Sequence, residues 1–145
     1  MNDLELVVKQ LEALTPGIER VITFSKYNEY DDLSGLEINY NDANQLFLQS
    51  ELRGILDKLS FIKHEIGYLS KPVRCEGTLR KNSIGKYELK NQRTFSCGSS
   101  LEAYIFDEFE ERYQWVAGVI EHNGEDYYLT GYRRLKLEGL KVRIR

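Results

Sequence analysis

The chain has 145 residues, of which 41% are hydrophobic and 30% charged, and its formal net charge is −3. This length fits one domain of ordinary size or a small domain with an extension, and the nearly balanced charge excludes a protein that coats nucleic acid or membranes by bulk charge. The sequence has no apolar run of the roughly 20 residues that a membrane span needs, and its acidic start is unlike a signal peptide. We therefore expect a cytoplasmic protein.

The charges are distributed unevenly along the chain. Residues 1–70 contain 6 Lys and Arg against 12 Asp and Glu, a net charge of −6, whereas residues 71–145 contain 14 against 11, a net charge of +3. The two parts should therefore have different surfaces. We predict a helical N-terminal region at 1–72 and a β-rich domain at 73–145.

The first predicted helix begins at Asn2, which forms a capping pair with Glu5. An apolar stripe at helical spacing follows, made of Leu4, Val7, Leu11 and Leu14. We expect the helix to end at Thr15-Pro16-Gly17. Residues 18–24 are compatible with a second helix after Pro16 or with a strand, and residues 25–41 have the composition of a loop.

A long helix is predicted from Asp42 to Leu69. Its apolar residues step by 4, 3, 4, 3, 4 and 3, which is an unbroken a/d heptad pattern. They are Leu48, Leu52, Ile55, Leu59, Ile62, Ile66 and Leu69. Such a seam needs a partner. We expect packing within the chain, with the first helix covering part of the seam and the β domain the rest, and a homodimer is the alternative.

The C-terminal part has the pattern of short β-strands. Strands are expected at 75–80, at 87–90, before the turn at 98–100, at 101–106, on both sides of Asn123-Gly124 and at 140–144. Leu101, Ala103 and Ile105 should face one way. Leu140, Val142 and Ile144 should also share a face, opposite Lys141, Arg143 and Arg145. This set of strands predicts an α+β protein whose C-terminal domain is a small closed antiparallel barrel of the SH3-like type.

Asn123-Gly124 predicts a two-residue type I′ hairpin turn, because both turn residues need positive φ. In the resulting register His122 faces Glu125 and Ile120 faces Tyr127. One face then carries Val116, Ile120, Tyr127 and Leu129, and the other carries Trp115, Val119, Tyr128 and Tyr132. Because both faces are apolar, the helices, a partner or a ligand should cover the second one.

The segments Phe95-Ser-Cys-Gly-Ser-Ser-Leu-Glu102, Trp115–Tyr128 and Leu135-Lys-Leu-Glu-Gly-Leu-Lys-Val-Arg-Ile-Arg145 resemble a small uncharacterised domain family. The resemblance covers about residues 75–145. That family occurs on plasmids, phages and integrative conjugative elements of Gram-positive bacteria. The resemblance implies a mobile genetic element as the context and supplies no catalytic residues. The acidic stretch at 107–114 is longer than the short turn typical of the family.

No catalytic, metal or cofactor site is predicted. Cys75 and Cys97 fit reduced thiols or one disulfide, and the absence of a signal peptide favours the thiols. The two cysteines and two histidines have no close spacing among them, so they do not make a zinc site. Neither His64 nor His122 has an obvious orienting partner, although Glu125 opposite His122 could form a surface pair with it. The sequence has no phosphate-binding loop, dinucleotide fingerprint or zinc-protease motif. We therefore expect a binding protein and not an enzyme.

The strongest functional signal is a set of six cations near the C-terminus. It comprises Arg133, Arg134, Lys136, Lys141, Arg143 and Arg145. Beside aromatic residues such as Trp115, Tyr128 and Tyr132, these cations would suit phosphates and stacked bases. Alternating cations on an edge strand also prevent aggregation, which is the competing interpretation.

These features lead to three functional hypotheses. The first is a non-enzymatic accessory protein of a mobile element that acts on nucleic acid or on a protein that handles it. The second is a protein-directed inhibitor of a host defence nuclease, because an acidic N-terminal half could meet a basic channel. The third is a self-assembling interaction protein.

Overall fold

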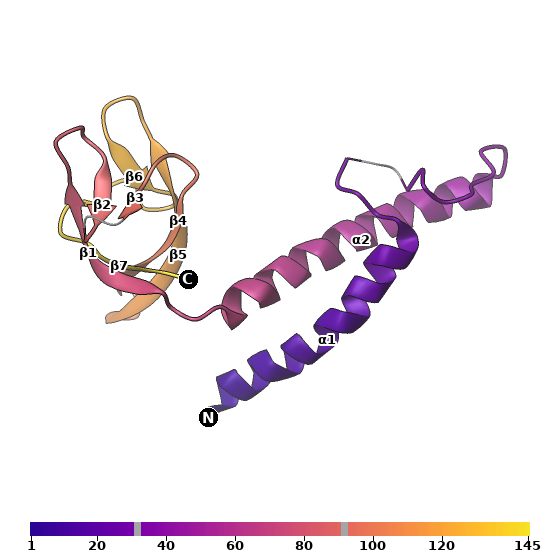
Figure 1. The fold of residues 1–145 in the computed structure, drawn as a ribbon, viewed down its shortest axis with the longest axis horizontal. Helices are drawn as coiled ribbons and strands as arrows, with labels where there is room; N and C mark the ends of the chain where they lie inside the picture. Colours follow the sequence, from indigo (N-terminus) through magenta and orange to yellow (C-terminus); the bar gives the residue numbers. More distant parts are fainter. Residues whose placement is uncertain (31–32, 91–92) are drawn as a thin grey trace. The chain divides into compact units, whose positions relative to one another are not determined.

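The computed structural model describes residues 1–30, 33–90 and 93–145. It divides into two compact units, Met1–Lys71 and Pro72–Arg145 (Figure 1). The first unit consists of helices α1 (Asp3–Ser25) and α2 (Ala43–Ser70), and the second is a β-sheet. Neither helix is long and apolar enough to cross a membrane.

Helix α1 begins as predicted but runs further. The Asn2 side chain accepts a hydrogen bond of 2.8 Å from the Glu5 backbone N–H, and Glu5 accepts one of 2.9 Å from the Asn2 N–H. The predicted stop at residues 15–17 is wrong, because α1 continues through Pro16 to Ser25. Proline removes one helical hydrogen bond. Tertiary packing outweighs that cost, since residues 18–25 include half-buried Ile18 and Ile22, and Glu19 in this part of α1 forms a salt bridge with Lys63 of α2.

Helix α2 matches its predicted span to within one residue at each end. Asp42 is its N-cap, and the carboxylate accepts hydrogen bonds of 2.8 Å and 3.4 Å from the N–H groups of Asn44 and Gln45. The helix ends at Ser70, where Lys71 is extended and Pro72 follows. The capping residue and the proline that set these limits are both visible in the sequence.

The two helices run antiparallel (Figure 1). A salt bridge of 3.4 Å joins Glu19 to Lys63, and the Tyr27 hydroxyl donates a short hydrogen bond to Asp57. Helix α1 covers one flank of the α2 seam. Leu56 lies on that flank, outside the heptad pattern, and is buried. The seam itself is covered only in part. Ile66 is buried and Leu59 half-buried, whereas Leu48, Leu52, Ile55, Ile62 and Leu69 are 41–53% exposed.

In the described part of the second unit, seven antiparallel strands form one sheet. They are β1 (Cys75–Lys81), β2 (Tyr87–Leu89), β3 (Arg93–Thr94), β4 (Ser100–Asp107), β5 (Arg112–His122), β6 (Tyr127–Leu129) and β7 (Lys141–Ile144). Their order is β3-β2-β1-β7-β4-β5-β6, so the last strand lies at the centre. The sheet curls into a half-barrel (Figure 1), which confirms the α+β class.

The core of this unit lies on the concave side of the sheet. Its fully buried members include Leu79, Leu89, Phe95, Leu101, Ala103, Ile120, Leu129 and Val142. The predicted inward faces of β4 and β7 are confirmed, because Ile105 and Ile144 are each only 8% exposed. At Gly118 a Cβ atom would lie 2.6 Å from the Leu129 side chain, so this strand position needs glycine.

The predicted register of the Asn123-Gly124 hairpin is wrong by two residues. His122 pairs with Tyr127 and Ile120 with Leu129, so the connection has four residues instead of two. The Asn123 side-chain oxygen accepts hydrogen bonds of 2.9 Å from both Glu125 N and Asp126 N, which stabilises the longer turn. A shift of two residues preserves the side-chain alternation. Ile120 and Leu129 therefore share the core face as predicted.

Candidate functional site

The convex surface of the sheet, called the outer face below, has a row of aromatic rings. Tyr104 and Phe106 project from β4, and Tyr113 and Trp115 project from β5, because these residues alternate with the core positions. The rings of Tyr104 and Tyr113 stack with centroids 4.9 Å apart, and Tyr104 lies 5.1 Å from Trp115. The strand register thus assembles residues from two strands into one aromatic row.

Lys141 and Arg143 of β7 lie beside this row, and together with Arg145, which directly follows the strand, they are called the β7 cations below. The Arg143 guanidinium is 4.2 Å from the centroid of Trp115, and the Lys141 ammonium is 5.1 Å from that of Tyr104. These are cation–π distances. A neighbouring strand of the same sheet thus contacts the Trp115 ring, whereas further cover by the helices, a partner or a ligand stays a prediction.

The β7 cations are also neutralised. Glu102 is only 5% exposed, and it accepts hydrogen bonds of 2.7 Å from Arg143 Nε and 2.6 Å from Arg145 Nε. Lys141 forms a salt bridge of 3.2 Å with Glu76. All three β7 cations thus have a carboxylate partner, which reduces their attraction for phosphate.

The other three predicted cations lie elsewhere, on the connection between β6 and β7. This segment, residues 130–140, is called the basic loop below. Leu137 is 2% exposed, and Tyr132 and Leu135 pack against the core. Because these apolar residues point inward, Arg133, Arg134 and Lys136 are left exposed at the intervening positions. The sequence therefore places three cations on a loop that the core holds in place.

The basic loop is tied to the sheet by backbone hydrogen bonds. Tyr132 N donates to Leu129 O at 2.9 Å, and Gly139 N donates to Leu79 O at 2.9 Å. Tyr132 was predicted to share a face with Trp115. That prediction is wrong, because the chain turns after Leu129 and brings the Tyr132 ring against the core.

A pocket of about 340 Å³ lies beside the basic loop. Its walls come from β2, the 123–128 segment and the loop, and comprise Tyr87, Asn123, Asp126, Tyr127, Tyr128, Arg133, Arg134, Leu135, Lys136, Leu137 and Glu138. The Arg133 guanidinium lies 5.2 Å from the centroid of the Tyr128 ring. The volume is within the range of small-molecule sites, so a base, a sugar or a phosphate fits.

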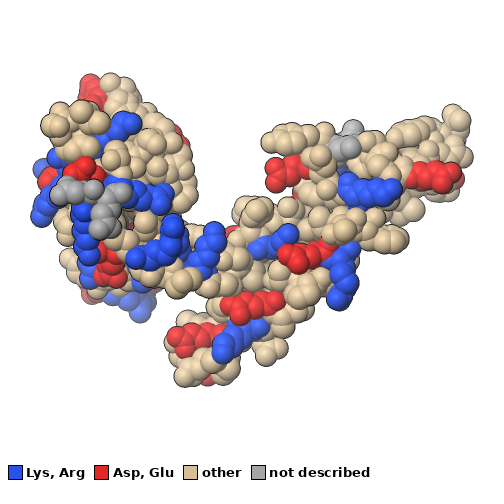
Figure 2. All heavy atoms as spheres, in the orientation of Figure 1, with Lys and Arg blue, Asp and Glu red and all other residues tan. Residues whose placement is uncertain are grey.

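Both carboxylates of this pocket have cationic partners. Asp126 accepts a hydrogen bond of 3.2 Å from Lys81 Nζ, and Glu138 forms a salt bridge of 3.4 Å with Arg80. By contrast, Arg133, Arg134 and Lys136 form no ion pair with any of the described residues. The three cations therefore give the pocket an uncompensated positive charge. Figure 2 shows Lys and Arg side chains, with Asp and Glu side chains among them, on the visible face of the sheet unit.

A tyrosine and an aspartate form a hydrogen-bonded pair at the edge of the pocket. Burial and the hydrogen bond of 3.1 Å that its hydroxyl donates to Asp126 raise the pKa of Tyr87 to about 12. Burial by itself would raise the pKa of Asp126. Hydrogen bonds from Tyr127 N, Lys81 and Tyr87 outweigh that effect and hold this pKa below its usual value. Asp126 is therefore ionised and Tyr87 protonated at neutral pH.

The remaining reactive side chains do not gather into a site. His64 is exposed on α2, and the Nδ1 atom of His122 accepts a hydrogen bond of 3.0 Å from Gly124 N. Cys75 and Cys97 are free thiols. Among the described residues no group of three or more His, Cys, Asp or Glu side chains could hold a metal ion.

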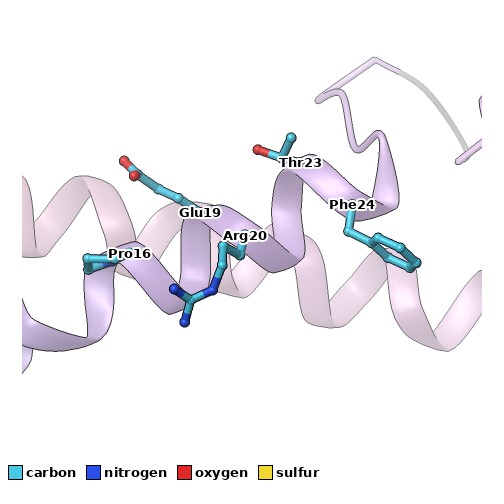
Figure 3. A pocket seen from close by; sticks show the side chains of 5 residues that line it. All are labelled: Pro16, Glu19, Arg20, Thr23 and Phe24. Atoms are coloured by element: carbon cyan, nitrogen blue, oxygen red, sulfur yellow. The ribbon is translucent and has the colours of Figure 1, made fainter.

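A second hollow lies on one side of α1. It has a volume of about 560 Å³ and is lined by Pro16, Glu19, Arg20, Thr23 and Phe24 (Figure 3). All five residues come from a single helix, with Pro16 and Phe24 at its two ends. It brings no cluster of polar groups together, and we assign it no role.

Residues 77–144 match the family model described as "Domain of unknown function (DUF5348)". The match lies within the sheet unit and agrees with the resemblance of this part of the chain to a small uncharacterised domain. The comparisons with curated proteins and with solved structures found no match.

The sequence alone did not identify Glu102, Tyr104, Phe106 or Tyr113 as members of the outer face. The alternation of the 101–106 strand did carry a signal, because residues that alternate with Leu101, Ala103 and Ile105 must point outward. Their neighbours could not be predicted, since the position of β7 beside β4 depends on the strand order. That order follows from pairings between distant residues.

Proposed function

We propose that the sheet unit binds single-stranded nucleic acid through the basic loop and its pocket. The observation that carries this proposal is a set of three cations, Arg133, Arg134 and Lys136, that have no carboxylate partner among the residues the structure describes. They lie beside a pocket whose own carboxylates are paired. Phosphates would meet these cations, and a base would lie against the ring of Tyr128. The role is binding and not catalysis.

The β7 cations have a secondary role in this proposal. Arg143 and Arg145 are held by Glu102, so they shape the outer face and contribute little to phosphate binding. The predicted six-residue stripe thus separates into a ligand-binding set on the loop and a structural set on β7.

Fluorescence anisotropy with labelled single-stranded DNA and RNA oligonucleotides at low salt tests the proposal. The double variant Arg133→Ala/Arg134→Ala should weaken binding at least tenfold and reduce the slope of log K against log salt by about 1.4, because two phosphate contacts are lost. The matched control Lys9→Ala/Arg20→Ala removes the same charge from α1 and should bind like the wild type. An absence of binding by the wild type, or an equal loss in both variants, would refute the proposal.

A protein partner is the second candidate, because the tip of the β4–β5 hairpin is both acidic and aromatic. Phe109 is 92% exposed between Glu108 and Glu110. The Asp107 carboxylate accepts hydrogen bonds of 2.9 Å and 3.0 Å from Phe109 N and Glu110 N, which orders the tip. Such a tip would suit the basic channel of a nuclease, and the chain would then act as a protein-directed inhibitor. A nuclease retained by the wild type but not by Phe109→Ser would support this candidate, and equal retention would exclude the tip.

The proposal also includes two finer assignments. The short strands and the curl of the sheet support a relationship to SH3-like barrels. The resemblance of the C-terminal segments supports an accessory role on a mobile genetic element. A gene neighbourhood without conjugation, replication or phage genes would contradict the second assignment.

A further inference from the structure

The two helices leave a large apolar surface that their contact with each other does not cover. Five residues of the α2 seam are each 41–53% exposed, and Leu52 and Ile55 lie near the middle of this exposed part. Helix α1 has a second stripe with steps of seven residues, formed by Val7, Leu14 and Val21, each 51–56% exposed. Steps of seven residues are the spacing that packs against another helix.

Both stripes lie on the same side of the helical pair. With 3.6 residues per turn, the α1 stripe lies about 80° around the helix axis from the half-buried face that contains Ile22. The α2 seam lies about the same angle around its own axis from buried Leu56. Viewed along each helix from its N-terminus, the two rotations have the same direction. Because the helices run antiparallel (Figure 1), the same sense about each axis brings both stripes to one side. The side chains thus form one continuous apolar face.

The size of this face matches a protein interface. Eight aliphatic side chains, each about half exposed, amount to on the order of 700 Å², close to the roughly 800 Å² that each partner contributes to a standard interface. Soluble monomers seldom expose apolar patches of that size. A heptad-spaced face packs best against another heptad-spaced face, and this chain supplies one in every copy.

The charges beside the seam indicate the orientation of the second copy. Glu51, Lys58 and Glu65 follow one flank at steps of seven and are exposed, without an ion-pair partner among the described residues. The opposite flank, with Leu56 and Lys63, is covered by α1. Antiparallel packing sets the free flank against itself, and a glutamate of one copy can then meet Lys58 of the other. Parallel packing would set it against the flank that α1 occupies.

We propose that this chain forms a homodimer in which α2 packs antiparallel on α2 of a second copy, with the α1 stripes alongside, in a four-helix arrangement. The exposed seam residues form the centre of the interface. The flank with Glu51, Lys58 and Glu65 faces the same flank of the second copy, and the ion pairs between them fix the antiparallel direction of the helices.

Light scattering of the full chain over a range of concentrations tests the interface. The wild type should have twice the monomer mass. Ile55→Asp should shift it to the monomer, with the helical circular dichroism retained. Phe61→Ser removes a side chain that is 65% exposed but lies outside the seam, and should remain dimeric. A wild type that is monomeric at every concentration, a larger assembly, or an Ile55→Asp variant that stays dimeric would overturn the proposal.

Charge reversal on the flank tests the orientation. Lys58→Glu makes the flank wholly acidic and Glu51→Lys/Glu65→Lys makes it wholly basic, so each variant alone should dimerise about tenfold more weakly through self-repulsion. An equimolar mixture should recover the dimer as a mixed species, identified by native mass spectrometry. If the mixture yields no excess of mixed dimer, the antiparallel arrangement is wrong.

Discussion

Glu102 organises the outer face. One buried carboxylate accepts hydrogen bonds from Arg143 and Arg145, and Arg143 in turn covers Trp115. A buried carboxylate is costly unless it is paired, and here both oxygens have a guanidinium partner. The residue therefore couples β4 to β7 through charge as well as through backbone hydrogen bonds.

The first prediction concerns the stability that Glu102 provides. Glu102→Ala should lower the free energy of unfolding by about 2–4 kcal/mol, because it leaves two partly buried guanidinium groups without their acceptor. Glu76→Ala, which removes the partner of half-exposed Lys141, should cost at most about 1 kcal/mol. Urea denaturation followed by tryptophan fluorescence measures both values. Equal losses would mean that the Glu102 pairs contribute no more than a surface salt bridge.

The second prediction concerns alkaline pH. The pKa of Tyr87 is about 12 in the folded protein, against about 10 in an unfolded chain. The unfolded state therefore loses its proton first as the pH rises, so the stability is fully present below pH 10 and decreases from about pH 10 to 12. Tyr87→Phe should show a smaller decrease over that interval when the unfolding midpoint in urea is measured against pH. An identical decrease would assign the effect to other groups.

At the scale of elements, local signals defined the helix starts. Asn2 with Glu5 and the cap at Asp42 are side-chain patterns with a direct physical role, and both helices begin where these residues predict. Pro16 is also a local signal, yet α1 continues through it, because packing on α2 is worth more than one missing hydrogen bond. Tertiary contacts of this kind cannot be predicted from a short stretch of sequence.

The third prediction concerns the cap of α2. Asp42→Ala should destabilise the helical unit by about 1 kcal/mol, because the N–H groups of Asn44 and Gln45 lose their acceptor. Asp42→Asn keeps an acceptor and should recover most of that loss. Thermal melting at 222 nm measures both variants. An equal loss in the two would point to the charge, and not to the hydrogen bonds, as the cause.

The hairpin shows the difference between predicting faces and predicting partners. Alternation correctly assigned Ile120 and Leu129 to the core, since a register error of two residues leaves the faces unchanged. The pairing itself was missed because Asn123 can accept hydrogen bonds from two backbone groups of a longer turn. Asn-Gly alone does not distinguish these two turns.

At the scale of the whole molecule, the two units differ in how completely they bury their own apolar residues. The sheet unit encloses its core, whereas the helical unit leaves its seam half exposed. The charge asymmetry predicted different surfaces for the two parts, and the heptad pattern predicted a seam that needs a partner, but neither pattern predicted how much of the seam is exposed. The division of the six cations into paired and unpaired sets could not be predicted, because it depends on which carboxylate each strand neighbour supplies.

The fourth prediction follows from the enclosed core. Residues 72–145 expressed alone should unfold cooperatively in urea, because every member of the sheet core lies between Cys75 and Ile144. Oligonucleotide binding should also be retained within about threefold, since the basic loop belongs to this unit. Residues 1–71 alone should keep their helicity, and their mass should depend on concentration because this unit carries the proposed dimer interface. A sheet unit that is unfolded by itself would show that the helices contribute to its core.

The central position of β7 has a consequence for the order of events during synthesis. Cys75 pairs with Ile144, and β7 lies between β1 and β4 in the sheet. The helical pair needs only contacts within the first 71 residues and can form while the rest of the chain is still being made. The sheet can be completed only after Ile144 has left the ribosome. Until then the β1 edge of one half and the β4 edge of the other remain unpaired. Synthesis rate and chaperone access should therefore affect the yield of the sheet far more than that of the helices.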